Sequence, residues 1–407
     1  MIKTSTAPSQ FEFIALMASL MSVVALAIDA LLPALELIGL DIGVQDAANN
    51  QLLITMIFLG LGIGPILFGP VSDSLGRKPI VYMGFIIFII ASIICVYAHT
   101  LEVMVAGRIL QGIGLSAPRT ISIAMVRDSY SGDYMARIMS FITVVFLLVP
   151  IIAPAFGKLI LDLYDWQAIF YAQLLFTVIV CFWFYKRQPE TLAVENRITL
   201  SSHLFKDGVR ELLRYKRTIL YTLISGFITG SFLVYLSASQ YIFQTQYGLV
   251  DEFPFIFAGL AISVGIATFT NGTLVVKLGM KRLVTYALWV YFLTSALYLL
   301  FFLGSSNPPV QILIAFFAVQ FFSVGFLFGN LRALAMEPVG HIAGIAAAIT
   351  GLISTLMAVP ISTFIGRYVA DDTALPLFAG FMICGSLSLL ILFWINRLSS
   401  KPNPDYA

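Results

Sequence analysis

Long apolar runs separated by short polar turns dominate the chain from residue 11 to residue 396. A run of about 20 apolar residues is long enough to cross the hydrocarbon core of a bilayer as a helix. Because the runs are continuously apolar rather than alternating, they predict helices and not the strands of a membrane barrel. Twelve spans are predicted, at residues 11–35, 49–71, 80–98, 102–126, 138–161, 166–185, 218–243, 254–276, 283–303, 309–333, 339–366 and 376–396.

One turn between two of these runs is rich in glycine and charge. It covers residues 69–79 and reads G-P-V-S-D-S-L-G-R-K-P. Part of it recurs, because Gly69, Gly76 and Lys78 have counterparts 203 residues later, at Gly272, Gly279 and Lys281. A repeat of about half the chain length indicates two homologous halves in tandem.

The repeat predicts an all-α membrane protein made of two pseudo-symmetric six-helix bundles. The first bundle covers residues 1–185 and the second covers residues 218–407. Residues 186–217 form the only long polar segment and are predicted to link the halves. Its apolar residues suggest a short amphipathic helix on the membrane surface; they are Leu204, Val209, Leu212 and Leu213.

Composition and charge agree with this topology. The chain is 59% hydrophobic and 11% charged, whereas soluble proteins are roughly 25% charged. If the N-terminus is cytoplasmic, 18 of the 23 Lys and Arg fall at cytoplasmic positions, which predicts that both termini are inside. The net charge of +2 therefore reflects topology and indicates no nucleic-acid partner.

Several classes of chemistry lack support in the sequence. The three cysteines lie in separate spans without C-x-x-C spacing, so neither a disulfide framework nor a metal site is predicted. The three histidines fall in turns, and no nucleophile and base share a span, so no catalytic residues are assigned and an enzyme is not expected. No phosphate-binding Walker sequence is present, so no nucleotide or other cofactor is predicted.

Three charged side chains inside the spans are candidates for function. Asp29 lies near the outer end of the first span, where a carboxylate costs about 2.5–3.5 kcal/mol on insertion scales. Arg108 lies one or two turns below the outer end of the fourth span, at a similar depth. We therefore expect Asp29 and Arg108 to pair or share a water; a purely structural hydrogen bond is the alternative for Asp29. Arg119, about three turns after Arg108, either faces the same side or extends toward the cytoplasm.

Two stretches of the sequence, the turn at residues 69–79 and the segment that begins at Arg108, resemble motifs of a known family. Gly69, Asp73, Gly76, Arg77 and Lys78 resemble the loop 2-3 motif of the major facilitator superfamily, G-x-x-x-D-R-x-G-R-[RK], with Ser74 at the usual place of an arginine. The R-x-x-Q-G-x-G sequence that begins at Arg108 resembles the helix 4 motif of the same family. The I-D-x-x-L-P-A-L run around Asp29 is similar to the drug:proton antiporters of the bicyclomycin and chloramphenicol resistance (Bcr/CflA) branch.

The resemblance implies two further groups of residues. On the cytoplasmic side it implies a charged latch that holds one conformational state, with a solvated loop ion pair as the alternative; the latch residues are Gly69, Asp73, Gly76, Arg77 and Asp128. In the fifth helix it implies helix packing against the C-terminal half, at Pro150, Pro154 and Gly157.

Polar side chains in the spans suggest a substrate cavity. Ser237 and Ser239 alternate with aromatic residues in the seventh span, which resembles the same branch, but hydrogen bonds between helices would use the same hydroxyls. Asn271 and Asn330 carry the same ambiguity. The candidate cavity residues are Asp29, Arg108, Gln111, Arg119, Tyr235, Ser237, Ser239, Asn271 and Asn330.

The sequence thus predicts a monomeric transporter in a bacterial inner membrane. Its expected partners are the bilayer, protons and a small amphipathic drug, which it would exchange by alternating access. In this hypothesis Asp29 binds a proton from the outside, which weakens its hold on Arg108 and on the drug. Export of an endogenous metabolite, such as a siderophore or amino acid, is the alternative on the same scaffold.

Overall fold

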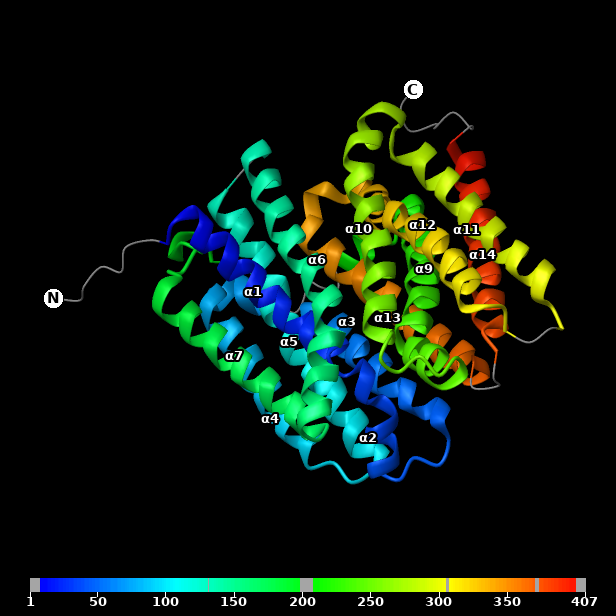
Figure 1. The fold of residues 1–407 in the computed structure, drawn as a ribbon. Coiled ribbons are helices and arrows are strands. Elements are labelled where there is room, and N and C mark those ends of the chain that lie inside the picture. Colours follow the sequence, from blue (N-terminus) through cyan, green and yellow to red (C-terminus); the bar gives the residue numbers. More distant parts are fainter. Residues whose placement is uncertain (1–7, 131, 198–207, 305–306, 370–372, 400–407) are drawn as a thin grey trace. The chain divides into compact units, whose positions relative to one another are not determined.

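The computed structural model describes residues 8–130, 132–197, 208–304, 307–369 and 373–399. Two compact units divide the chain, one formed by residues 1–201 and 249–258 and the other by residues 202–248 and 259–407. The boundary at residue 201 lies inside the predicted linker 186–217. Both units consist of helices in their described parts (Figure 1).

The first unit is built from long helices joined by short turns. Its elements in order are α1 (Gln10–Asp29), the 3-10 turn η1 (Leu32–Ala34), α2 (Leu35–Asp41), the 3-10 turn η2 (Ala47–Gln51), α3 (Leu52–Leu75), α4 (Arg77–Val96), α5 (Leu101–Ser129), α6 (Gly132–Leu163), α7 (Gln167–Arg187) and the 3-10 turn η3 (Val194–Asn196). The predicted span 11–35 lies within one candidate membrane span, Gln10–Asp41, in which the α-helix gives way to a 3-10 turn after Asp29.

The second unit repeats this pattern. Its elements are α9 (Lys216–Gln240), the π-helical turn η4 (Tyr241–Gln246), α10 (Phe253–Leu278), of which the residues up to Ala258 fall in the first unit, α11 (Met280–Phe302), α12 (Val310–Met336), the 3-10 turn η5 (Glu337–Ile342), α13 (Ala343–Val369) and α14 (Leu375–Ser399). The predicted span 339–366 begins too early, because residues up to Ile342 belong to η5 and α13 begins at Ala343.

Eleven helical segments in the described part of the chain are long and apolar enough to cross a membrane. The exposed face of α11 illustrates the apolar character of these segments. Its exposed large side chains include Trp289, Leu293, Leu297 and Leu300, which recur every three or four residues. An exposed apolar stripe of this kind suits contact with lipid rather than with water.

Close backbone contacts hold the helices of the first unit together. A Cβ atom added to Gly60 in α3 would lie 2.1 Å from the carbonyl oxygen of Ile109, and one added to Gly112 in α5 would lie 2.0 Å from that of Ile57. Small residues at such crossings let two membrane helices approach closely. This contact fixes α5, which carries Arg108, against α3.

Part of the predicted amphipathic helix of the linker packs within the second unit. Residues 208–212 are helical, and Leu212 is 1% exposed in a cluster with Val339, Ala346 and Ile349. Leu212 and Val209 therefore pack on η5 and α13 within the second unit, whereas Leu213 is exposed, and contact of this segment with a membrane surface stays a prediction. Leu204 lies outside the described residues.

Candidate functional site

The break in the first helix places Asp29 at the end of α1. Pro33 has no N–H and cannot donate the hydrogen bond that the carbonyl of Asp29 would accept in a continuous helix. The chain continues instead through η1, where the Ala34 N–H donates to the Leu31 carbonyl at 2.9 Å. Asp29 is only 6% exposed, so the break lies inside the first unit.

Helix α6 packs directly on this break. A Cβ atom added to Gly157 would lie 1.9 Å from the carbonyl oxygen of Ala30, which leaves room for glycine alone. Pro150 and Pro154 lie in the same helix, and Pro154 is buried. Gly157 thus packs against α1 in the N-terminal half; packing of α6 against the C-terminal half stays a prediction.

Arg108 is fully buried and connects three helices through its guanidinium group. Its Nε donates to the Leu53 carbonyl in α3 at 2.7 Å, and its Nη1 donates to the Ala27 carbonyl in α1 at 3.1 Å. Nη1 also donates to Oε1 of Gln111 at 2.8 Å. A cation at the last carbonyls of a helix is favourable, because the helix dipole is negative there. Arg108 therefore stabilises the end of α1 where Asp29 lies.

Of the two expected arrangements of Asp29 and Arg108, the direct ion pair is not formed, and a shared water stays a prediction. Arg108 contacts the backbone of Ala27, two residues before Asp29, but no ion pair within 4.0 Å joins the two charged groups in the described part of the chain. The backbone carbonyls and Gln111 take its Nε and Nη1 atoms instead. Its Nη2 atom is buried and has no hydrogen-bond partner among the residues that the structure describes.

Gln111 extends the network to a fourth helix. Its Nε2 donates to the hydroxyl of Ser92 in α4 at 2.7 Å. The second unit contains the same device, because Nε2 of Gln320 in α12 donates to the hydroxyl of Ser295 in α11 at 3.1 Å. Ser295 follows Ser92 by 203 residues, the offset of the loop repeat. The second unit lacks an arginine at this contact, and Oε1 of Gln320 is buried without a hydrogen-bond partner within the described ranges.

Arg119 lies on the same helix as Arg108 but in a different environment. Its side chain is exposed on the first unit, whereas Arg108 is fully buried. Pro118 beside it is buried, and a Cβ atom added to Gly84 would lie 3.1 Å from the Pro118 ring. Pro118 therefore packs on α4, and a contact of Arg119 with substrate stays a prediction.

The structure brings the charged residues of the predicted latch together. Arg77 donates through Nε and Nη2 to the Asp128 carboxylate at 2.9 and 3.3 Å, and through Nη1 to Asp73 and to Ser72. Gly76 precedes α4 with a φ of 106°, which a side chain would disfavour. Gly69 has open space around it instead. These contacts place a buried arginine between two carboxylates within the first unit, and its role as a conformational latch stays a prediction.

Glu190 contacts the same cluster, and the sequence analysis did not predict this contact. Its carboxylate accepts hydrogen bonds from the backbone N–H groups of Arg77 and Lys78, each at 3.0 Å. Thr191 beside it donates to Asp128 at 3.0 Å. A Pro-Glu pair directly after the sixth span, beside a basic turn, was the only signal in the sequence.

In the second unit the candidate cavity residues largely bond to helices. The Ser237 hydroxyl donates to the Leu233 and Val234 carbonyls and lies 3.4 Å from that of Ser362 in α13. Ser239 donates to the Leu236 carbonyl within α9. These contacts correspond to the alternative of hydrogen bonds within and between helices.

The remaining cavity candidates in this unit are also engaged. The ring of Tyr235 packs on Phe317 and Phe321 in α12, with centroids 5.1 and 4.4 Å away. Nδ2 of Asn330 donates to Oδ1 of Asn271 at 2.7 Å, so the two amides bond to each other across α10 and α12.

The chain was compared with known proteins. The family model of the Major Facilitator Superfamily matches residues 17–360. A bicyclomycin resistance protein homolog of Haemophilus influenzae is 29% identical, with 97% of this chain and 98% of that protein covered. The multidrug resistance protein MdtL of Klebsiella pneumoniae is 31% identical over 35% of this chain and 36% of that protein.

Solved structures share the fold. A D-xylose-proton symporter gives a TM-score of 0.72 at 14% identity, with 95% of this chain and 96% of that chain covered. The human organic anion transporter MFSD10 gives 0.66 at 17% identity, with 95% and 99% covered. The resemblance noted in the loop 2-3 and helix 4 motifs is thereby confirmed. Because the family model covers most of its length, this chain belongs to the Major Facilitator Superfamily.

Proposed function

We propose that the chain exports small amphipathic drugs across the bacterial inner membrane in exchange for protons. It does so as a monomer with twelve spans in two bundles of six, whose rocking exposes a site to each side in turn. Both termini are cytoplasmic in this proposal, which the distribution of Lys and Arg supports. The family and the names of its resistance-protein relatives support drug export.

The observation that carries the proposal is a pair of charged groups at the break in helix 1, Asp29 and Nη2 of Arg108, neither of which has a hydrogen-bond partner among the described residues. Asp29 is buried, and no hydrogen bond or ion pair reaches its carboxylate from the described residues. Nη2 of Arg108 is buried and equally without a partner there. A charge in the membrane interior is costly unless it is paired, and such residues commonly lie on ion or substrate pathways.

In this proposal, binding of a proton to Asp29 changes the favoured position of the chain at the break in helix 1. Arg108 is held by three hydrogen bonds, so its Nη2 atom is a fixed donor, whereas the chain after Asp29 is not a continuous helix. An ionised Asp29 is drawn toward Nη2, and a protonated Asp29 is not. The two protonation states thus favour different positions of the helix 1 break, which is the differential interaction that a conformational shift requires.

The same charges predict the class of drug. With Asp29 ionised, Arg108 and Arg119 would leave this half of the proposed cavity with an excess of positive charge. Neutral, zwitterionic or weakly anionic compounds, such as amphenicols, bicyclomycin-like compounds or sulfonamides, are therefore preferred over dications. At such a site the guanidinium groups of Arg108 and Arg119 would repel a dication.

The test is uptake into inside-out vesicles that contain the purified protein and an imposed pH gradient. Chloramphenicol accumulates, and dissipating the gradient abolishes accumulation. Dication uptake that exceeds amphenicol uptake contradicts the proposed charge preference. The protein is also expressed in an efflux-deficient host, and the concentration of each drug that inhibits growth is measured. If none of these concentrations changes, the result contradicts drug export and favours export of a metabolite.

A further inference from the structure

The first long helix of each unit ends at a buried polar residue and continues as a turn of another kind. In the first unit, α1 ends at Asp29, and the 3-10 turn η1 begins at Leu32. In the second unit, α9 ends at Gln240, and the π-helical turn η4 begins at Tyr241. Interrupted helices in corresponding positions of two repeats are a good pointer to the substrate site of a transporter. Gln240 and η4 therefore define a second candidate site, within the second unit.

The π turn lies in the packed interior of the second unit and is not a frayed helix end. The N–H of Tyr247 donates to the carbonyl of Ile242 at 3.2 Å, five residues earlier, where an α-helix has a spacing of four. Ile242 and Phe243 in this turn are fully buried, and the Phe243 ring packs on that of Phe317 in α12 with centroids 6.1 Å apart. Single π turns of this kind occur frequently at functional sites.

Hydrogen bonds to neighbouring segments fix the end of η4. Nε2 of Gln246 donates to the Val369 carbonyl at the end of α13 at 2.8 Å, and Nδ2 of Asn307 donates to Oε1 of Gln246 at 2.9 Å. The hydroxyl of Tyr247 donates to the Pro308 carbonyl at 2.7 Å. Both ends of the Gln246 amide are therefore satisfied, and the turn is held by α13 and by the segment before α12.

Gln244 lies in the same turn, but one end of its amide has no partner. Nε2 of Gln240 donates to Oε1 of Gln244 at 2.7 Å, so the two amides form a pair. Both residues are buried, with exposed fractions of 4% and 8%. Nε2 of Gln244 has no hydrogen-bond partner in the part of the chain that the structure describes. A buried N–H donor without an acceptor is costly, so a ligand atom that accepts from it would be bound favourably.

Other polar groups of this helix are already engaged. The hydroxyls of Ser237 and Ser239 donate to carbonyls of α9, and Nε2 of Gln240 donates to Oε1 of its partner amide. Among the donors of these four side chains, Nε2 of Gln244 is thus the one that remains. It carries two hydrogens and no charge, so it recognises acceptor atoms. A largely apolar surrounding with a few fixed polar groups is typical of small-molecule sites.

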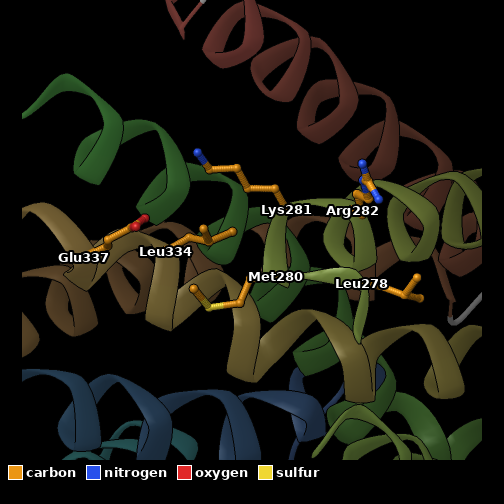
Figure 2. A pocket seen from close by; sticks show the side chains of 7 residues that line it. Leu278, Met280, Lys281, Arg282, Leu334 and Glu337 are labelled. Atoms are coloured by element: carbon orange, nitrogen blue, oxygen red, sulfur yellow. The ribbon is translucent and has the colours of Figure 1, made fainter. Parts of the chain in front are cut away.

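The hollow in Figure 2 is a different candidate for ligand binding in the second unit, and its chemistry is different. It has a volume of about 320 Å³ and lies at the start of α11, with Lys281, Arg282 and Glu337 as its polar side chains. All three are charged, and neither Gln240 nor Gln244 lines this hollow. Recognition of an uncharged group is therefore assigned to the amide pair.

We infer that the amide pair Gln240–Gln244 binds an uncharged oxygen acceptor of the substrate, such as a nitro, amide or hydroxyl oxygen. Nε2 of Gln244 donates to this oxygen. Gln240 positions the donor, because its own N–H holds Oε1 of Gln244 and so fixes which end of that amide is available. Since the contact carries no charge, it suits neutral and zwitterionic compounds. This inference rests on the proposed drug export and names one contact by which the second unit would bind the drug.

Binding of chloramphenicol to the detergent-purified full chain tests this contact, because that drug has nitro, amide and hydroxyl oxygens. Gln240→Met combined with Gln244→Met removes both amides and keeps the length of the side chains. We expect the affinity, measured by equilibrium dialysis, to fall about tenfold, the effect of losing one or two hydrogen bonds. The unfolding midpoint of the drug-free protein should not fall, because both partners of the internal hydrogen bond are removed together.

Gln320→Met is the matched control for the loss of a buried amide. Gln320 lies inside α12, and its Nε2 donates to Ser295 in α11 rather than remaining available. We expect this variant to bind chloramphenicol within twofold of the unmodified protein. An equal loss of affinity in the control and in the double variant overturns the inference, because any buried amide would then have the same effect.

Two other results also overturn it. One is an unchanged affinity in the double variant. The other is a lowered unfolding midpoint in the double variant, which shows that the amides are structural and that Nε2 of Gln244 is satisfied without a drug. If the unmodified protein binds no chloramphenicol, the proposed function is contradicted for this drug, and the midpoint of the drug-free double variant then decides the inference alone.

Discussion

The contact between α6 and the helix 1 break makes Gly157→Ala the sharpest test of how Asp29 is positioned. A Cβ atom at residue 157 lies 1.9 Å from the carbonyl oxygen of Ala30 and 2.9 Å from its carbonyl carbon. Carbon and oxygen atoms that are not bonded to each other repel strongly at that separation. The two backbones must therefore move apart by roughly 1 Å, and no change of rotamer can relieve the clash.

The magnitude follows from two opposing effects. Overpacking a tight contact typically costs about 1–3 kcal/mol. Replacing glycine by alanine inside a helix returns about 1 kcal/mol. Because the atoms in conflict belong to the backbone, we expect an overpacking cost in the upper part of its range of about 1–3 kcal/mol. After the gain from alanine is subtracted, the free energy of unfolding falls by about 1–2 kcal/mol.

The assay is thermal unfolding of the detergent-purified protein together with drug uptake into vesicles. Gly259→Ala is the matched control, because Gly259 lies inside α10 and has no atom within 4 Å of the added Cβ position. Gly157→Ala lowers the unfolding midpoint and slows uptake, while Gly259→Ala does neither. If Gly157→Ala behaves like Gly259→Ala in both measurements, α6 does not support the break as described.

Three further substitutions test other contacts. Arg108→Lys keeps the charge but loses the fork that joins Leu53, Ala27 and Gln111, so we expect at least a tenfold loss of uptake with normal membrane insertion; uptake near that of the unmodified chain contradicts a positioning role. Glu190→Gln places an amide donor against backbone N–H groups of α4, and should lower the unfolding midpoint measurably more than Glu195→Gln does. Ser237→Ala removes a hydroxyl that bonds to its own helix, so uptake should change by less than twofold; a larger loss, with unchanged stability, favours a role in drug binding.

The helical architecture could be predicted from the sequence because a long run of apolar residues identifies a membrane span without any knowledge of its tertiary contacts. The predicted edges mostly lie within a few residues of the observed helices; α14, for example, covers Leu375–Ser399 where 376–396 was predicted. The interruption of helix 1 was missed, although Pro33 carried the signal. Proline is tolerated in some membrane helices, so its presence does not by itself reveal a break.

The candidate site was harder to predict, because its partners are distant in sequence. Helix depth placed Arg108 near α1, but whether its guanidinium meets a carboxylate or a carbonyl depends on side-chain geometry. The bond from Arg77 to Glu190 joins residues 113 apart. The cluster of Arg77 with Asp73 and Asp128 could be predicted, because the resemblance to the family motif named these residues.

Proton release upon drug binding measures the central claim most directly. In weakly buffered detergent solution, adding chloramphenicol to the unmodified protein should release protons at some pH between about 6 and 9, because Asp29 exchanges its proton for drug. Asp29→Asn, which keeps the shape of the side chain but cannot ionise, should abolish the release while the helices remain folded. Equal release from both proteins, or none from the unmodified protein across this range, contradicts coupling through Asp29.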